Sequence, residues 1–261
     1  MFEHVIVSVD GGLEARAVLA PAADLAWRCG AKLVVVSTTR SAQRGTRDLL
    51  KGQAMARSGA DVDFWVDPTR DPGDALLETV AHRSAPIVCL ASRYRDGGLL
   101  RRRGAANPLP ASVMRRSTAP VLVIGPEMEV GGGLPVGELF VPLDDGPASH
   151  RAALMAGSLA RSLRLAVRLL VLVPPSVDDP HPPATAAAIA EEVRVRGVET
   201  TCEVVQTAQP AAALAAIAGE SEGGVVVCPE TGGDHRRPLG PFAAELVATS
   251  TRAVLFPPPG A

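Results

Sequence analysis

The sequence predicts an α/β fold made of two tandem, doubly wound domains, each with a parallel sheet covered by helices on both faces. Three observations predict it. Short Val-, Leu- and Ile-rich runs alternate with alanine-rich segments, as buried strands alternate with crossover helices. The same series of segments occurs twice. The length of 261 residues suits two ordinary domains, and 47% hydrophobic but only 3% aromatic residues imply aliphatic cores.

The internal repeat rests on three apolar segments that keep the same order in both halves. The pairs are 4–10 with 138–144, 86–92 with 224–230, and 120–126 with 253–259. Their separations are 134, 138 and 133 positions, and the first segment ends in Asp in both halves. A nearly constant period indicates one structural unit present twice. We therefore expect domains over 1–125 and 138–261, joined by a Gly- and Pro-rich linker over 126–137.

The elements of the first repeat follow from local pattern. Continuous apolar runs predict buried strands, and segments of helix formers with an apolar face predict helices. The helix over 14–29 is expected despite Pro21, and acidic residues with Pro mark a helix start near 71. The expected strands are 4–10, 32–38, 62–66, 86–92 and 120–124; the expected helices are 14–29, a weaker 43–57, 71–83 and 108–117.

The second repeat has the same order of elements. Its expected strands are 138–144, 166–173, 199–205, 224–228 and 253–256, and its expected helices are 147–163, 184–196, 208–220 and 241–250. Strands that alternate with helices are joined by right-handed crossovers, so each sheet is expected to be parallel.

Bulk features argue against several classes of protein. A formal net charge of -2 gives no general attraction for nucleic acid. None of the four cysteines lies in a CxxC pair, and Cys89 and Cys228 sit in apolar runs, so we expect buried free thiols. A signal peptide and an apolar run of about 20 residues are both missing from the sequence, which leads us to expect a cytoplasmic protein with no membrane partner.

Catalytic and metal-binding motifs are also missing from the sequence. The histidines show no metal-ligand spacing, no serine lies in a GxSxG frame, and neither a P-loop nor a strand-anchored GxGxxG is present. We therefore expect no metal and no catalytic residue.

A ligand is expected where the order of strands in an open parallel sheet reverses, beyond the carboxyl ends of the first and fourth strands. Asp10 and Asp144 end the first strands there. Either carboxylate can accept hydrogen bonds from a ribose, while the last helix offers N–H groups to phosphate. The alternative for both residues is to cap the following helix.

These features together resemble the universal stress protein family. Its domains begin with an apolar strand ending in Asp, as 4–10 and 138–144 do, and close with a strand like PVLVI at 120–124. The resemblance covers essentially the whole chain as a tandem pair. It implies a Rossmann-like or flavodoxin-like sheet of five strands in the order 3-2-1-4-5. Asp10 and Asp144 match the family's ribose-contacting aspartate, and Ser149 matches a serine common early in the first helix, where the first repeat has Ala15.

The family's ATP-binding motif is degenerate in both repeats. That motif is Gly, two residues, Gly, nine residues, Gly, then Ser or Thr. In the first repeat, Ala91 replaces the first glycine and Asn107-Pro108 replaces the final Gly-Ser pair. In the second repeat, Pro229 and Gly240-Pro241 stand at these positions. A proline at the first helical position removes an N–H that phosphate would use. The arginines at 101–103 in the first repeat, or at 236–237 in the second, could replace this lost contact by binding the phosphate themselves. Alternatively, these arginines could form a solvated loop.

The candidate ligand-binding residues are therefore twelve. They are Asp10, Gly11, Ala91, Gly97, Gly98, Asn107, Asp144, Asp145, Pro229, Gly232, Gly240 and Pro241. Gly232 keeps the place of the middle glycine, which favours the second repeat slightly, although its loop is shorter than the family's.

The resemblance implies a stress-response sensing module that binds ATP weakly or has lost the ability to bind ATP. It also implies that the protein is not an enzyme. The two last strands are expected to pack as an internal pseudo-dimer, with an unknown protein partner and a possible homodimer. Two alternatives remain open at this point: a slow nucleotide hydrolase or transferase, and a pure protein-interaction module with closed pockets.

Overall fold

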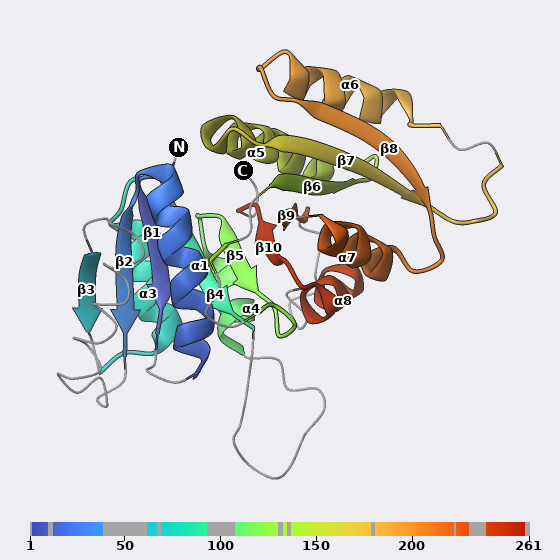
Figure 1. The fold of residues 1–261 in the computed structure, drawn as a ribbon. Coiled ribbons are helices and arrows are strands. Elements are labelled where there is room, and N and C mark those ends of the chain that lie inside the picture. The colour runs from blue at the N-terminus through green and yellow to red at the C-terminus, as the bar shows by residue number, and fades with distance from the viewer. Residues whose placement is uncertain are drawn as a thin grey trace, which may run out of the picture. The chain divides into compact units, whose positions relative to one another are not determined.

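A computed structural model describes most of the chain (Figure 1). The described residues are 2–9, 13–38, 62–66, 69–92, 108–129, 133–134, 137–178, 181–221, 223–229 and 239–258. The helix expected over 43–57 lies outside them. The chain divides into two compact units, Phe2–Leu134 and Pro135–Ala261. Each unit is described by itself below.

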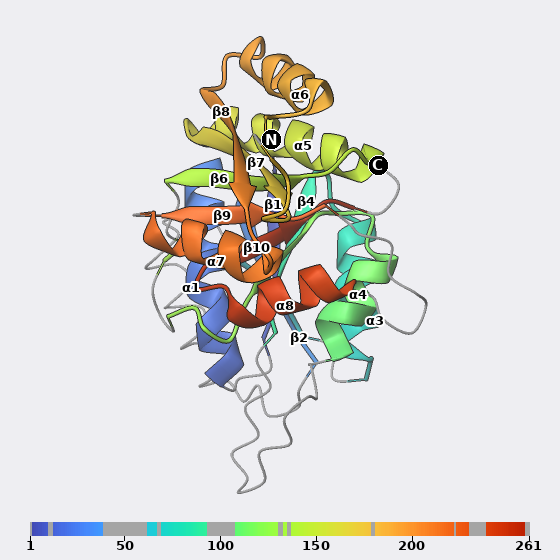
Figure 2. The same ribbon diagram turned by 90° about the vertical axis from the view of Figure 1, so that its right-hand side faces the viewer.

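The first unit contains a parallel sheet in the order β3-β2-β1-β4-β5. Its strands are β1 (His4–Ser8), β2 (Lys32–Ser37), β3 (Val62–Val66), β4 (Pro86–Ala91) and β5 (Val121–Ile124), and its helices are α1 (Leu13–Cys29), α3 (Pro72–Ala81) and α4 (Pro108–Arg116). Helix α1 covers one face, while α3 and α4 pack together on the other (Figures 1 and 2).

The second unit contains a parallel sheet in the order β8-β7-β6-β9-β10. Its strands are β6 (Glu138–Leu143), β7 (Ala166–Val173), β8 (Thr200–Gln206), β9 (Gly224–Val227) and β10 (Ala253–Phe256), and its helices are α5 (Pro147–Leu163), α6 (Ala184–Arg194), α7 (Pro210–Glu220) and α8 (Pro241–Thr249). Helices α5 and α6 cover one face, and α7 with α8 covers the other (Figure 1).

The two sheets pair their strands in the same register. The equivalent pairs are Val5–Leu33 with Leu139–Val167, Leu33–Val62 with Val167–Thr200, Val5–Ile87 with Leu139–Val225, and Val88–Val121 with Val226–Val254. A slip of one residue would turn every buried side chain to the opposite face, so identical register means identical inward-facing positions. The predicted fold class is therefore confirmed, including the strand order 3-2-1-4-5.

Several helices begin or end one or two residues away from the positions expected from the sequence, and local chemistry explains the difference. Asp71 caps α3, because its Oδ1 accepts the N–H groups of Gly73 at 2.8 Å and Asp74 at 3.3 Å. Helix α7 begins at Pro210, where a missing N–H costs nothing. Helix α6 ends at Arg194, shortly before Gly197 takes a positive φ of 80° that a helix cannot accommodate.

Both cores are aliphatic, as the composition predicted. The central strands β1, β4, β6 and β9 bury their residues everywhere except at some strand ends, where residues are half-buried. Cys89 and Cys228 are fully buried free thiols, which confirms the expectation for them. Burial raises the pKa of the Cys228 thiol to about 12 and raises the pKa of Cys89 further still. Neither thiol is therefore a nucleophile near neutral pH in the folded protein.

A search of the described helices finds none with the length and apolar character needed to cross a bilayer. The same residues contain no group of three or more His, Cys, Asp or Glu side chains placed to hold a metal ion.

Candidate functional site

The reversal of strand order lies between β6 and β9 in the second unit. These strands are neighbours, and their last matched pair is Phe140 with Val226. Beyond this pair, β9 ends at Val227, two residues before Pro229, while β6 runs on to Leu143. Asp144 follows immediately. Two predicted site residues, Asp144 and Pro229, therefore follow the carboxyl ends of two neighbouring strands, where such sheets bind ligands.

Asp144 is held by the first turn of α5. Its Oδ1 accepts the Gly146 N–H at 2.8 Å and the Ser149 hydroxyl at 2.5 Å. In return, the Ser149 Oγ accepts the Asp144 N–H at 3.2 Å. Ser149 is completely buried, whereas Asp144 is exposed, so the pair links the interior of the unit to its surface. A side chain on Gly146 would place its Cβ 2.9 Å from Asp144 Oδ1, so only glycine allows this approach.

The two interpretations offered for Asp144 are compatible with each other. One oxygen, Oδ1, organises the start of α5, which is the capping role. The other oxygen, Oδ2, has no hydrogen-bond partner among the described residues, and the Asp144 side chain is exposed. The carboxylate is thus oriented by the protein through one oxygen while the second remains available to a hydroxyl donor.

Asp145 has a different partner. The hydroxyl of Thr185, in the first turn of α6, donates to Asp145 Oδ1 at 3.0 Å. Helix α5 is also linked to α6, since His150 on α5 lies 2.7 Å from the Glu192 carboxylate on α6. Asp145 therefore ties the turn after β6 to α6. Sequence reasoning placed Asp145 in the site but missed Thr185, which lies 40 residues away and carries no motif.

The last helix of the second unit starts as the degenerate motif predicts. Gly240 is the N-cap of α8, with extended backbone and no side-chain cap, and Pro241 stands in the first turn. The first N–H groups of a helix have no intrahelical partner, and Pro241 has none to offer. Phe242 and Ala243 are then the first residues of α8 that can donate to a ligand. Pro229, at the position of the first glycine, is buried and also lacks an N–H.

In the first unit the described part of the site is smaller. Ala91 ends β4, level with Val9 in the extended register of β1. Ser92 is turned back toward β5, because its N–H and its hydroxyl both donate to Ile124 O, at 2.9 and 3.2 Å. Six candidate residues lie outside the described residues: Asp10, Gly11, Gly97, Gly98, Asn107 and Gly232. The arginines at 101–103 and 236–237 also lie outside them.

Comparison with known proteins identifies the fold. The sequence matches no protein-family model, and no curated protein is similar enough to count as a relative. Among solved structures, a universal stress protein from Archaeoglobus fulgidus DSM 4304 superimposes with a TM-score of 0.68 at 14% identity, covering 98% of this chain and 96% of that one. A putative universal stress protein from Pseudomonas aeruginosa UCBPP-PA14 has a TM-score of 0.59 at 14% identity, covering 98% and 92%.

A third solved structure shows that this fold also occurs within another kind of protein. The cytoplasmic domain of a prokaryotic cation chloride cotransporter superimposes with a TM-score of 0.54 at 11% identity, covering 98% of this chain and 95% of that one. At such identities, similarity shows the fold, whereas function has to be argued from the site. The whole chain therefore has the fold of the tandem universal stress proteins, as its repeated strands and its paired aspartates predicted.

Proposed function

We propose that this chain is a universal stress protein that acts as a sensing or regulatory module, binds an adenine nucleotide weakly in its second repeat, and does not turn the nucleotide over. The observation that carries the proposal is the arrangement of Asp144. Its Oδ1 is fixed by Gly146 and Ser149, and its Oδ2 is free among the described residues at the strand-order reversal. A carboxylate held in this way is suited to accept the hydroxyls of a ribose.

The chemistry of the phosphate end supports weak binding. Two prolines, Pro229 and Pro241, stand where the family motif offers backbone N–H groups or a hydroxyl. A hydrogen bond to a charged group contributes about 1.5–3 kcal/mol. Two such losses correspond to an affinity lower by a factor of about 100 or more than that of an intact site. The N–H groups of Phe242 and Ala243 remain as donors for phosphate at the start of α8.

The partners of the two carboxylates support the proposal of binding without turnover. A general base must reach the proton that it removes. Asp144 Oδ1 already accepts two hydrogen bonds, and Asp145 Oδ1 accepts one from Thr185. Both carboxylates thus have structural or ribose-facing roles, so we assign neither to proton transfer. The output of the module is then a change in its affinity for a protein partner.

A second candidate function is a pure interaction module with a closed cleft. The observation that favours it is Pro229, whose buried ring occupies a position where the family motif has a glycine. In that case nucleotide would have no effect on partner binding.

Equilibrium binding of labelled ATP to the full chain tests the proposal. We expect weak, saturable binding that falls about tenfold in Asp144→Asn, which keeps an oxygen for Gly146 and Ser149 but loses the charge. Glu199→Gln, which removes an exposed carboxylate outside the candidate residues, is the control and should bind as the unmodified chain does. Asp10→Asn reports on the first repeat. Undetectable binding to the unmodified chain at millimolar ATP would favour the interaction module, and sustained ATP hydrolysis lost in Asp144→Asn would favour an enzyme.

A further inference from the structure

Strand β8 forms one edge of the sheet in the second unit (Figure 1). It spans Thr200–Gln206 and pairs with β7 on one side, while no described strand pairs with its other side. Its sequence, TTCEVVQ, contains no proline and no lysine, the residues that commonly protect the edge of a sheet from further pairing. The outer side of β8 is therefore a template for another strand.

The backbone of β8 alternates between its two sides. The Val167 N–H of β7 donates to Glu199 O, just before β8, at 2.9 Å. The Thr207 N–H, just after β8, donates to Val173 O at 2.8 Å. Residues 199 and 207 thus turn their backbone groups toward β7. Because this direction alternates along a strand, the odd-numbered residues of β8 turn toward β7 and the even-numbered residues turn outward.

One of the outward groups already has a partner. The Arg194 Nε, at the end of α6, donates to Thr200 O at 3.0 Å. The remaining outward residues are Cys202, Val204 and Gln206, whose backbone N–H and C=O groups have no partner among the described residues. These three residues form an unpaired ladder with Val204 at its centre.

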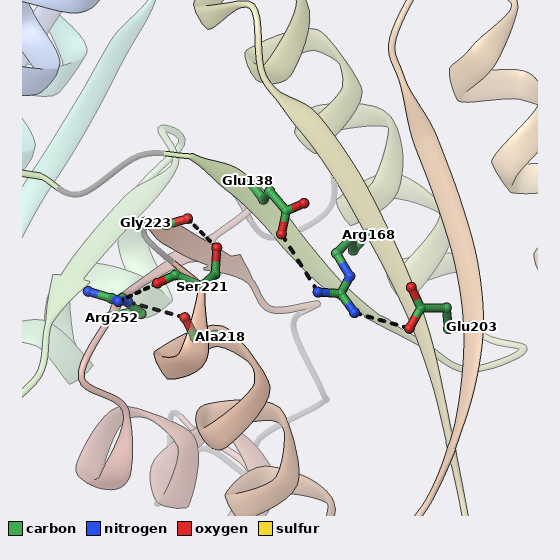
Figure 3. A network of polar contacts seen from close by, with 7 residues as sticks. All are labelled: Glu138, Arg168, Glu203, Ala218, Ser221, Gly223 and Arg252. Atoms are coloured by element: carbon green, nitrogen blue, oxygen red, sulfur yellow. Dashed lines mark hydrogen bonds and ion pairs between the residues drawn. The ribbon is translucent and has the colours of Figure 1, made fainter.

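The charge on β8 is directed away from its free side. Its one charged residue, Glu203, lies 3.1 Å from the Arg168 guanidinium on β7, so the carboxylate lies across the sheet (Figure 3). The edge strand of the first unit, β3, has five residues against seven in β8. Asp63 on β3 pairs with Lys32 at 3.1 Å and with Arg83 at 3.5 Å. Charged side chains hinder pairing at an edge, so β8 is the more receptive of the two.

A second copy of β8 fits this ladder. In an antiparallel pair centred on Val204, that residue lies opposite its own counterpart, and Cys202 of each copy lies opposite Gln206 of the other. Each of these pairs exchanges N–H···O bonds in both directions, so every free group of the edge is satisfied. Between them, Glu203 lies opposite Val205, and no two like charges are directly opposed.

Other registers of the same pair are less favourable. A pair centred on Glu203 would place two carboxylates directly opposite each other, which is destabilising. A pair centred on Cys202 would bring Val204 against Thr200, whose carbonyl already has a donor. A pair centred on Val205 would carry Cys202 past the end of the partner strand. The edge is therefore complementary to itself in a single register, which favours a second copy of this chain over an unrelated strand.

Helix α6 leaves room beside this edge. It runs antiparallel to β8, and Arg194 marks the side of the helix that faces the edge, because it reaches Thr200 O. Ala187 lies two turns earlier on the same side, about 10 Å along the helix and thus level with the middle of β8. Ala184 and Ala187 are both exposed. Their small side chains allow two copies of α6 to approach each other closely.

We propose that two copies of this chain associate through β8, in an antiparallel register centred on Val204, so that the sheets of their second units continue into one another. The association rests on the free backbone groups of the edge, as it does wherever an extended strand adds to a sheet. It uses no residue of the candidate nucleotide cleft, so it does not depend on the function proposed above.

Sedimentation equilibrium of the full chain over a range of micromolar concentrations tests the association. We expect a reversible equilibrium between monomer and dimer. Val204→Pro should weaken it about tenfold or more, because each copy loses its central N–H donor while the bonds from β8 to β7 remain. Val204→Thr keeps the N–H and should associate as the unmodified chain does. Val66→Pro, at the same place in the register of β3, is the matched control and should leave the dissociation constant unchanged.

A cysteine placed in the expected register tests the geometry. Gln206→Cys would bring a thiol opposite Cys202 of the second copy, where the Cα atoms of a hydrogen-bonded pair lie about 5.5 Å apart, within reach of a disulfide. Within one copy the same two positions lie about 13 Å apart and cannot be joined. Oxidised glutathione should therefore convert this variant into a covalent dimer on a non-reducing gel. Gln209→Cys, at an exposed position beyond the end of β8, is the control and should remain monomeric on that gel.

Three results would overturn the proposal. The first is a monomer at every concentration in the absence of oxidant. The second is a dimer that persists in Val204→Pro or is lost in Val66→Pro. The third is equal cross-linking of Gln206→Cys and Gln209→Cys. Thermal unfolding shows whether each proline variant is folded; if Val204→Pro is not, the cross-linking of Gln206→Cys decides, since that variant keeps every backbone donor.

Discussion

Ser149 and Asp144 exchange two hydrogen bonds, with the Ser149 hydroxyl donating to the carboxylate at 2.5 Å and accepting the Asp144 N–H at 3.2 Å. The pair joins the end of β6 to the first turn of α5. It also fixes the carboxylate so that its other oxygen is free among the described residues. The local stability of the strand–helix junction and the geometry of the candidate ribose contact therefore depend on the same two side chains.

Ser149→Ala should destabilise the second unit by about 1–2 kcal/mol, because the Asp144 N–H loses its acceptor and Asp144 Oδ1 loses one of its two donors. Urea denaturation followed by circular dichroism measures the change. Ser158→Ala is the control in the same helix: Ser158 is exposed and its hydroxyl returns only to Leu154 O at 3.0 Å. Equal effects of the two substitutions would contradict the role given to Ser149.

Arg252→Met should cost about 2 kcal/mol of unfolding free energy, since three carbonyls at the end of α7 lose a charged donor. Methionine keeps much of the aliphatic length, so the change reports on hydrogen bonds more than on packing. Hydrogen exchange should accelerate in the last turn of α7 before it does elsewhere in the unit. Arg161→Met, at an exposed position of α5, should have little effect, and a matching loss there would refute the explanation.

Gly224→Ala should destabilise the protein by about 1–3 kcal/mol, because the new Cβ would lie 2.6 Å from Phe140 Cε2 in a packed core. Replacing Phe140 with Leu in the same chain should recover part of the loss, and a double-mutant cycle measures the coupling. In contrast, Gly219→Ala within α7 should be neutral or slightly stabilising, because alanine favours a helix more than glycine does. The atom nearest to the new Cβ would be Thr251 Oγ1, at 3.2 Å.

The buried thiols make stability depend on pH in the alkaline range. Burial raises the pKa of Cys228 from 9.0 to about 12, so the folded state favours the neutral thiol. This contribution of Cys228 to the free energy of unfolding is fully present below pH 9 and is lost as the pH rises toward 12. Between these values the thiol of the unfolded chain releases its proton, whereas the buried thiol of the folded chain keeps it. Cys228→Ala should flatten this decline by up to about 1.4 kcal/mol per pH unit. An unchanged slope between pH 9 and 10.5 would contradict the burial.

Much of the fold was predictable because its signals are local. Apolar runs marked every described strand to within two residues, and Pro210, Pro241 and Gly197 mark helix ends through backbone constraints. The repeat then implied that both halves share one topology. The placement of Asp144 at the end of a strand was predictable for the same reason, because it is a property of sequence order; its role in binding a ligand stays a prediction.

Side-chain contacts that join distant segments were less predictable. Thr185 reaches Asp145 across 40 residues, and Arg252 reaches Ser221 across 31, with no motif at either end. Arg168 interrupts an apolar strand, which signals a special environment. Its partner Glu203 follows only once the register of β7 with β8 is known.

The most direct measurement of the central claim is NMR mapping of ATP on the ¹⁵N-labelled full chain. The account predicts saturable shifts at the amides of 144–146 and at Phe242 and Ala243, with little change at Val9 and Ser92 in the first repeat. Absence of shifts at 144–146 at saturating ATP, or shifts confined to the first repeat, would contradict it.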